Sequence, residues 1–213
     1  MDLLEATRMA TTPSIKGSVF VGVVEALEKA ISDGAISPGE LDRRLDPSDL
    51  ELLEAEILVS SWYDIRAYTR INELLRDAVG QGSNEYLKTR GRETARRLLE
   101  AGFYAQLEYL NRTEVSQTSG QQARFEAFGR DLRKLSTISA SILNFSNWSS
   151  APDPAHADRY VLEVSEAIDF PEVLCWRSDG FVNEMSSLHG EGDLWEWKRV
   201  APDRVVFTMH RGM

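Results

Sequence analysis

The spacing of apolar residues changes about two thirds of the way along the chain, and this change constrains the fold more than any other feature. Before residue 143, apolar residues recur at steps of three and four, the period of a helix that buries one face. After it, residues 145–148 and 160–164 alternate in the manner of strands. The first helical series contains Val19, Phe20, Val23, Val24, Leu27 and Ile31. A helical first part and a partly stranded second part are therefore expected.

The first part is expected to hold five or six helices. Clear apolar stripes predict helices over about 64–79 and 84–101, a continuation over 103–110, and a long helix from Phe125 to Ile142 after a polar loop at 113–122. Gly91 lies inside the second of these. Because a glycine within a helix costs about 1 kcal/mol relative to alanine, this position predicts the close approach of another backbone.

The second part has the order strand, strand, helix, strand, strand. Residues 149–154 are rich in Ser and Pro and predict a turn, Asp169-Phe170-Pro171-Glu172 predicts a helix start, and Ala201-Pro202-Asp203 predicts a hairpin turn between 194–200 and 204–210. The expected fold is α+β, with an N-terminal helical part followed by a ββαββ antiparallel sheet unit. We expect residues 1–14 to be a flexible tail and residues 15–213 to be a single domain, divided into 15–142 (helical) and 143–213 (α/β).

Charge and targeting signals narrow the class of partner and the location. The 213 residues carry a formal net charge of −10, which opposes nucleic acids and anionic lipid surfaces. The start of the chain has no basic region followed by an apolar core, and the longest apolar run, Val19 to Val24, is too short to span a membrane. A cytoplasmic protein without nucleic-acid or membrane partners is expected.

Residues that could support catalysis or bind a metal are few. The histidines are His156, His189 and His210, and no pair of them has the helical spacing of a metal site, so surface or loop positions are the simpler interpretation. The single cysteine, Cys175, follows Val173 and Leu174, which favours a buried and inert thiol. No catalytic residue, metal site or cofactor is predicted from these residues.

A basic run between residues 88 and 97 has two interpretations. Arg92, Arg96 and Arg97 could form a docking patch for an acidic or phosphorylated partner. Alternatively, they belong to a solvated helix and pair with nearby carboxylates such as Glu93 and Glu100. The second interpretation is the simpler one, because charged runs usually keep a helix surface hydrated.

Large aromatic residues gather near the end of the chain. Trp195 and Trp197 are two residues apart, so they share one face of a strand. Such a cluster can be the wall of an apolar ligand pocket, an exposed protein-binding surface, or the core between sheet and helix. The candidate residues for binding a ligand or partner are Trp148, Trp176, Phe181, Trp195 and Trp197.

Four short runs together resemble a known group of proteins: 16–20 (Lys-Gly-Ser-Val-Phe), 62–65 (Trp-Tyr-Asp-Ile), 91–95 (Gly-Arg-Glu-Thr-Ala) and Gly180-Phe181. Their order is similar to that in an uncharacterised family of about 200 residues expanded in myxobacteria, whose architecture is similar to heme–nitric-oxide-binding and vinyl-reductase-type domains. The resemblance covers about residues 15–210. It implies a ligand-binding or regulatory fold with a cavity between the helical part and the sheet.

The resemblance does not imply a cofactor for this chain. The heme branch uses a histidine from its helical part and a Tyr-x-Ser-x-Arg run, and this chain has neither; no histidine precedes His156. The vinyl-reductase branch uses several cysteines near its end, where this chain has only Cys175.

Three hypotheses follow. The first is a non-enzymatic regulatory or sensory domain that binds a small apolar ligand, a partner protein, or both. The second is a homo-oligomeric assembly or scaffold protein with no ligand, which requires an exposed apolar face on the C-terminal sheet. The third is an enzyme of unrecognised type, which requires a carboxylate or His189 in a cleft.

Overall fold

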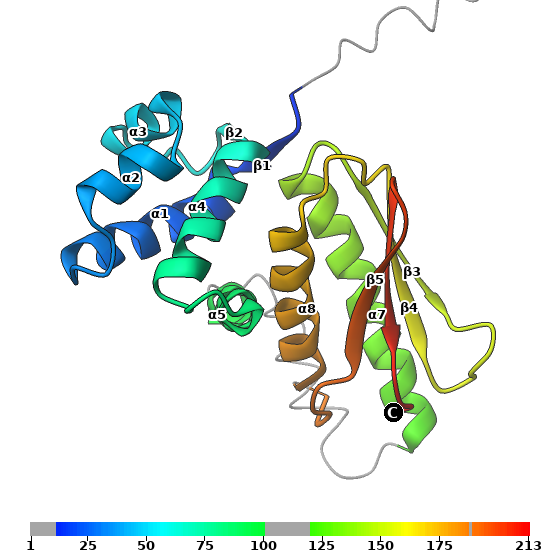
Figure 1. Ribbon diagram of the computed structural model, residues 1–213. Coiled ribbons are helices and arrows are strands. Elements are labelled where there is room, and N and C mark those ends of the chain that lie inside the picture. Colours follow the sequence, from blue (N-terminus) through cyan, green and yellow to red (C-terminus); the bar gives the residue numbers. More distant parts are fainter. Residues whose placement is uncertain (1–11, 101–119, 188) are drawn as a thin grey trace, which may run out of the picture.

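The computed structural model describes residues 12–100, 120–187 and 189–213. In Figure 1, a group of helices from the first half of the chain lies beside a twisted sheet that is covered on one face by two helices. The expected α+β class is confirmed by this arrangement.

The helical part follows its apolar pattern closely. Its elements are β1 (Ser14–Lys16), α1 (Gly17–Ser32), α2 (Pro38–Arg44), α3 (Pro47–Glu54), β2 (Trp62–Asp64), α4 (Ile65–Ala78) and α5 (Asn84–Glu100). On α1, the residues Phe20, Val23 and Leu27 are fully buried at steps of three and four. Both α2 and α3 begin with proline, which lacks the N–H that a first helical turn leaves unpaired.

A small two-stranded sheet was not predicted. The strands β1 and β2 pair antiparallel, with Ser14 opposite Asp64 and Lys16 opposite Trp62. An isolated bridge between Ile15 and Leu143 ties β1 to the second part of the chain. The predicted flexible tail, 1–14, is therefore wrong at its end, because backbone pairing orders Ser14; residues 1–11 lie outside the described residues.

The second part has the predicted ββαββ order. It contains α7 (Gln121–Ile142), β3 (Asn147–Pro152), β4 (Tyr160–Ser165), α8 (Glu172–Ser187), β5 (Trp195–Ala201) and β6 (Arg204–Met209). The four strands form an antiparallel sheet in the order β3-β4-β6-β5. The predicted loop at 113–122 is wrong at its end, since α7 already begins at Gln121, and residues 101–119, including the predicted continuation over 103–110, lie outside the described residues.

The predicted turn at 149–154 is also wrong in its first four residues. Ser149 to Pro152 belong to β3 and pair with Tyr160 to Glu163 of β4. Pro152 can end the strand because β3 is an edge strand, where a missing N–H costs no ladder bond. Serine and proline at these positions indicated a turn, but the cross-strand pairing decides the structure.

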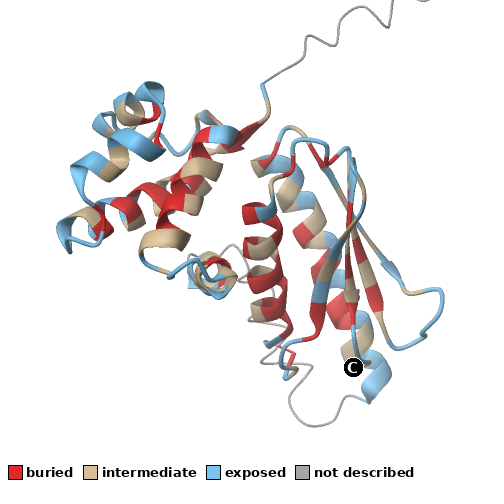
Figure 2. Ribbon diagram, in the orientation of Figure 1, coloured by how far each residue is buried: buried red, intermediate tan, exposed pale blue. Residues whose placement is uncertain are grey.

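One face of the sheet is apolar and meets α7 and α8. Trp195 and Trp197 lie opposite Met209 and Phe207, which are buried, so both tryptophans are on this inner face. Their spacing predicted that they share a face, but it left open which face. The opposite face carries Glu163, Lys198 and Glu196 among its residues. Figure 2 shows buried residues on α8 and along the strands, and also on α1 and α4 of the helical part.

Helix α8 lies between the sheet and α5, with buried residues on both sides. Gly91 of α5 faces the backbone of α8: a Cβ atom there would lie 1.9 Å from the carbonyl oxygen of Arg177. The close backbone approach predicted at Gly91 is confirmed. None of the described helices is long and apolar enough to cross a membrane.

Candidate functional site

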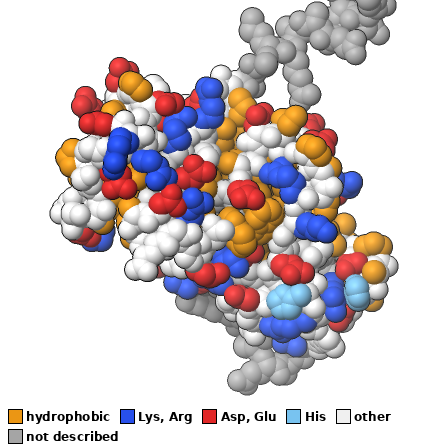
Figure 3. Space-filling model, in the orientation of Figure 1, with side chains coloured by type: hydrophobic (Ala, Val, Ile, Leu, Met, Phe, Trp, Pro, Cys, Tyr) orange, Lys and Arg blue, Asp and Glu red, His pale blue; other side chains and the backbone are white. Residues whose placement is uncertain are grey.

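A cavity of about 90 Å³ lies where the helical part meets the α/β part. Its wall combines residues from α1, α4 and α5 with residues from α7, α8, β3 and β4. Figure 3 shows apolar side chains gathered near the middle of the viewed face. The described residues that line the cavity are Ile15, Val19, Tyr68, Gly91, Thr94, Leu98, Leu135, Ser136, Ile138, Ser139, Ile142, Leu143, Trp148, Leu162, Leu174, Arg177, Ser178, Phe181 and Val182.

The apolar lining follows from helical periodicity. On α7, Leu135, Ile138 and Ile142 stand three and four residues apart and so share one side of the helix. On α8, Leu174 and Phe181 are two turns apart and face the same space. Ile15 enters from β1, which the bridge to Leu143 holds against the end of α7.

A wider groove of about 540 Å³ adjoins the cavity. It runs between α1 and α5 and reaches Val59 in the loop before β2. Cavity and groove share the lining residues Val19, Thr94, Leu98, Ile138, Ile142 and Arg177. The cavity and the groove are therefore parts of one larger depression.

Among the described residues that line the cavity, Arg177 is the charged one. It is only 7% exposed. Its Nη1 donates to Asn72 Oδ1 at 2.9 Å, its Nη2 donates to Thr94 Oγ1 at 3.2 Å, and its guanidinium lies 5.6 Å from the centre of the Tyr68 ring. These partners are all neutral. Sequence reasoning missed this residue, because an arginine on a helix is normally assigned to the surface.

Tyr68 forms the floor beneath Arg177. Its side chain is fully buried, and burial raises the pKa of the phenol while the nearby positive charge of Arg177 acts in the opposite direction. The raised pKa keeps Tyr68 neutral at physiological pH.

Two of the five residues predicted to bind a ligand or partner line the cavity. Trp148 reaches it from β3 and stacks on Phe207 at a ring distance of 5.8 Å, and Phe181 reaches it from α8. The Nε1 atom of Trp148 is buried without a hydrogen-bond partner among the described residues.

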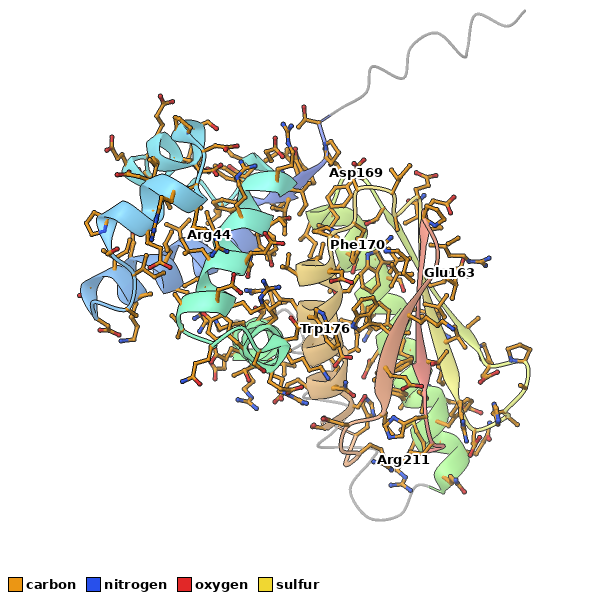
Figure 4. All side chains as sticks on the ribbon, viewed as in Figure 1. Arg44, Glu163, Asp169, Phe170, Trp176 and Arg211 are labelled. Atoms are coloured by element: carbon orange, nitrogen blue, oxygen red, sulfur yellow. The ribbon has the colours of Figure 1, made fainter. Side chains whose placement is uncertain are left out.

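The other three tryptophans pack elsewhere on the inner face of the sheet. Trp176 of α8 (Figure 4) meets Trp197 edge to face at 5.1 Å. Trp195 is 3% exposed, and its Nε1 donates to Ser186 Oγ at 2.9 Å. None of these three is among the described residues that line the cavity or the groove, and Trp195 has the environment of a core residue.

The arginines predicted as a docking patch form ion pairs within the chain. Arg96 makes a bidentate contact with Glu184 at 2.7 and 2.9 Å, Arg92 contacts Asp193 at 2.7 Å, and Arg97 contacts Glu25 at 3.4 Å. These partners lie on other elements rather than on the same helix, so Arg92 and Arg96 fasten α5 to α8 and to the loop after it. Docking of a partner on this surface stays a prediction.

One histidine is not on the surface. His189 is 4% exposed, and its Nε2 lies 2.9 Å from Oδ2 of the buried Asp131. Neither residue is among those that line the cavity or the groove. His156 and His210 are exposed. Within the described residues, no group of three or more His, Cys, Asp or Glu side chains is arranged to hold a metal ion.

The fold is shared with solved structures of H-NOX proteins. A mutant H-NOX protein from K. algicida in the unliganded Fe(II) state superposes with a TM-score of 0.60 and 11% identity, over 92% of this chain and 95% of that one. An oxygen-binding H-NOX domain related to soluble guanylate cyclases, solved as its oxygen complex, gives 0.52 and 11%, over 93% and 96%. Neither a protein-family model nor a curated protein matches the sequence. The expected architectural likeness to heme–nitric-oxide-binding domains is thus confirmed as a likeness of fold.

Proposed function

We propose that this chain is a non-enzymatic regulatory or sensory domain that binds a small, mostly apolar ligand in the cavity between its helical and α/β parts. The observation that carries the proposal is the composition of the cavity wall, to which both parts contribute. A ligand there touches α1 and α5 on one side and α7, α8 and the sheet on the other. Binding therefore favours whichever relative position of the two parts fits the ligand best.

A solved structure with the same fold supports a sensory role for this chain. One of the solved structures that share this fold is an oxygen-binding domain caught with its ligand, so a small molecule can be held within this architecture. The described part of the cavity wall is mostly apolar and includes one charged group, a composition typical of small-molecule sites.

Heme, the group implied by the fold, does not fit the residues of this chain. None of the described residues that line the cavity is a histidine or a cysteine, and no histidine precedes His156 anywhere in the sequence. Among the described lining residues, Tyr68 is the remaining side chain that could bind an iron, but burial holds it neutral and it lies against the cation of Arg177.

The groups available at the cavity support binding rather than catalysis. A general acid–base reaction needs a titratable side chain within hydrogen-bond reach of the substrate. The carboxylate of Glu93, which lines the groove, is already paired with Arg90 at 2.5 Å. The buried pair of His189 and Asp131 lies outside both depressions among the described residues.

A cavity-filling substitution tests this proposal. Val19 lines both cavity and groove, so the larger side chain of Val19→Trp should fill the space where the two meet. Val200→Trp is the matched control, since Val200 is 50% exposed on the sheet. Intrinsic fluorescence and calorimetry, with octanoate, 1-octanol and toluene as probes, should give saturable binding to the wild type and the control. Binding to Val19→Trp should be at least about tenfold weaker.

Two results contradict the proposal. The first is the absence of saturable binding with every probe. The second is equal affinity of the wild type and a folded Val19→Trp variant, because the ligand would then lie elsewhere.

A further inference from the structure

Arg177 is a buried cation with no ion pair to a carboxylate among the described residues. We propose that the ligand of the cavity is an amphipathic acid whose carboxylate pairs with Arg177 while its apolar tail fills the space beside it. This inference rests on the proposed function and adds the chemical class of the ligand.

The first argument is the cost of an uncompensated charge. Removing a cation from water is expensive unless an anion or several strong acceptors replace the hydration shell. Within the described residues, Arg177 has only the amide oxygen of Asn72 and the hydroxyl of Thr94. The arginines on the neighbouring helix, Arg92 and Arg96, both have carboxylate partners. In a chain with a net charge of −10, carboxylates are abundant, yet the most buried arginine of this region pairs with none of those that the structure describes.

The second argument is that Arg177 is held in place without being neutralised. Asn72 uses its own Nδ2 to bind the carbonyl oxygen of Tyr68 at 2.7 Å, and the hydroxyl of Thr94 donates to the carbonyl oxygen of Arg90 at 2.9 Å. Each acceptor is therefore fixed in orientation by a second hydrogen bond. A guanidinium fixed in this way offers its remaining N–H groups in the planar geometry that suits a carboxylate.

The third argument is the charge of the groove that leads to Arg177. Its described lining includes the cations Lys16, Arg90 and Arg97 and the carboxylate Glu93. Arg90 pairs with Glu93 and Arg97 pairs with Glu25, so Lys16 and Arg177 are the cations of this lining that have no carboxylate partner among the described residues. The excess of positive charge is local, because the chain as a whole is strongly acidic. Such a groove attracts a small anion and repels a cation at the entrance.

The two depressions together define the shape of the ligand. Arg177 lines both of them, so a carboxylate bound there has apolar walls on the cavity side, formed by Leu135, Leu174 and Phe181. A molecule with one acid group and one short apolar tail satisfies both environments. A neutral apolar molecule satisfies only the cavity and leaves Arg177 unpaired.

Matched pairs of an acid and its alcohol test the inference on the wild-type protein. The probes are hexanoate, octanoate and decanoate, each compared by calorimetry with 1-hexanol, 1-octanol and 1-decanol. The acid should bind at least about tenfold more tightly than the alcohol of the same length, since hydrogen bonds to a charged group are the strong ones. Raising the salt concentration should weaken the binding of the acid and leave the affinity for the alcohol unchanged.

Variants of Arg177 identify the group responsible. Arg177→Met should lose the preference for the acid while it still binds the alcohol, and Arg177→Lys should keep part of the preference. The control is Arg43→Met, an exposed arginine on α2 whose Nε donates only to the carbonyl oxygen of Gly39; it should behave as the wild type. If Arg177→Met does not fold, the affinities of the wild type for the acid and for the alcohol still test the inference.

The outcomes separate the two proposals. Equal affinity for acid and alcohol overturns the inference about Arg177 and leaves the proposed function standing. A preference for the acid that persists in a folded Arg177→Met variant also overturns the inference. Failure of every acid and every alcohol to bind contradicts the proposed function itself.

Discussion

Gly91 of α5 and Gly180 of α8 occupy reciprocal positions, each facing a backbone carbonyl of the other helix. A Cβ at Gly91 would lie 1.9 Å from the carbonyl oxygen of Arg177, and a Cβ at Gly180 would lie 1.9 Å from that of Lys88. The two helices therefore touch backbone to backbone. This contact brings Thr94 within hydrogen-bonding distance of Arg177, and so the glycine pair also sets the geometry of the cavity wall.

Gly91→Ala should destabilise the protein by more than about 2 kcal/mol, because the added methyl group meets backbone rather than a flexible side chain. The gain in helix propensity, about 1 kcal/mol, is too small to offset this clash. Urea denaturation measures the change. Gly39→Ala on α2 is the control, since the added Cβ would lie in open space. The stability of this variant should differ from that of the wild type by less than about 1 kcal/mol. Equal effects of the two substitutions would contradict the close helix contact.

The ion pair between Arg70 and the buried Asp49 is expected to contribute more to stability than an exposed ion pair. Asp49 is 2% exposed and accepts from Arg70 at 2.6 and 2.8 Å. Arg70→Met leaves the buried carboxylate unpaired and should cost on the order of 3–5 kcal/mol. The same change at Arg66, whose side chain is 72% exposed beside Asp64, should cost at most about 1 kcal/mol. Thermal and urea unfolding of both variants provide the comparison, and similar losses would argue against a buried pair.

Cys175 should be unreactive in the folded protein. Burial raises the pKa of its thiol to about 12, so almost none of it is thiolate near neutral pH. In the native protein, the reaction of Cys175 with Ellman's reagent should be slow and take hours. In guanidinium the reagent should label one thiol per chain at once, because Cys175 is the single cysteine. Rapid labelling without denaturant would show that α8 opens readily or that the thiol is accessible.

Asp179 should make stability fall as the pH rises. Burial raises the pKa of this carboxyl above its ordinary value of 3.8, although Lys88 acts in the opposite direction. Between the unfolded and the folded pKa the native state holds more protons than the unfolded state, so the free energy of unfolding decreases with increasing pH in that window.

The Asp179→Asn variant should therefore gain stability relative to the wild type as the pH rises from about 3 to about 7. Urea denaturation across this range measures the difference. Asp203→Asn, at an exposed turn residue, is the matched control. A difference that stays constant with pH, or that shrinks, would contradict the raised pKa.

The parts of the fold that the sequence predicted are those in which periodicity and conformational preference agree. The spacing of Trp195 and Trp197 predicted a shared strand face, and Gly91 predicted a backbone contact; both are confirmed. The strand character of residues 149–152 was missed because it depends on pairing with β4, a contact that local propensity does not contain.

The site was harder to predict for a related reason. Trp148 and Phe181 were among the candidates and line the cavity, but Arg177 was not considered. Its burial results from the position of α8 between α5 and the sheet. The signal available in the sequence was the surroundings of Arg177: Val173, Leu174 and Cys175 precede it and Gly180 and Val182 follow it, so apolar or small residues lie on more than one side of this helix.

The most direct test of the cavity as the ligand site is a crystal structure of the protein soaked with hexanoate that carries bromine on its terminal carbon. We predict an anomalous bromine peak among Leu135, Leu162 and Leu174, with the carboxylate within hydrogen-bonding distance of the Arg177 guanidinium. A peak on the outer face of the sheet, or a cavity without the acid at a concentration that saturates binding in solution, would contradict the account.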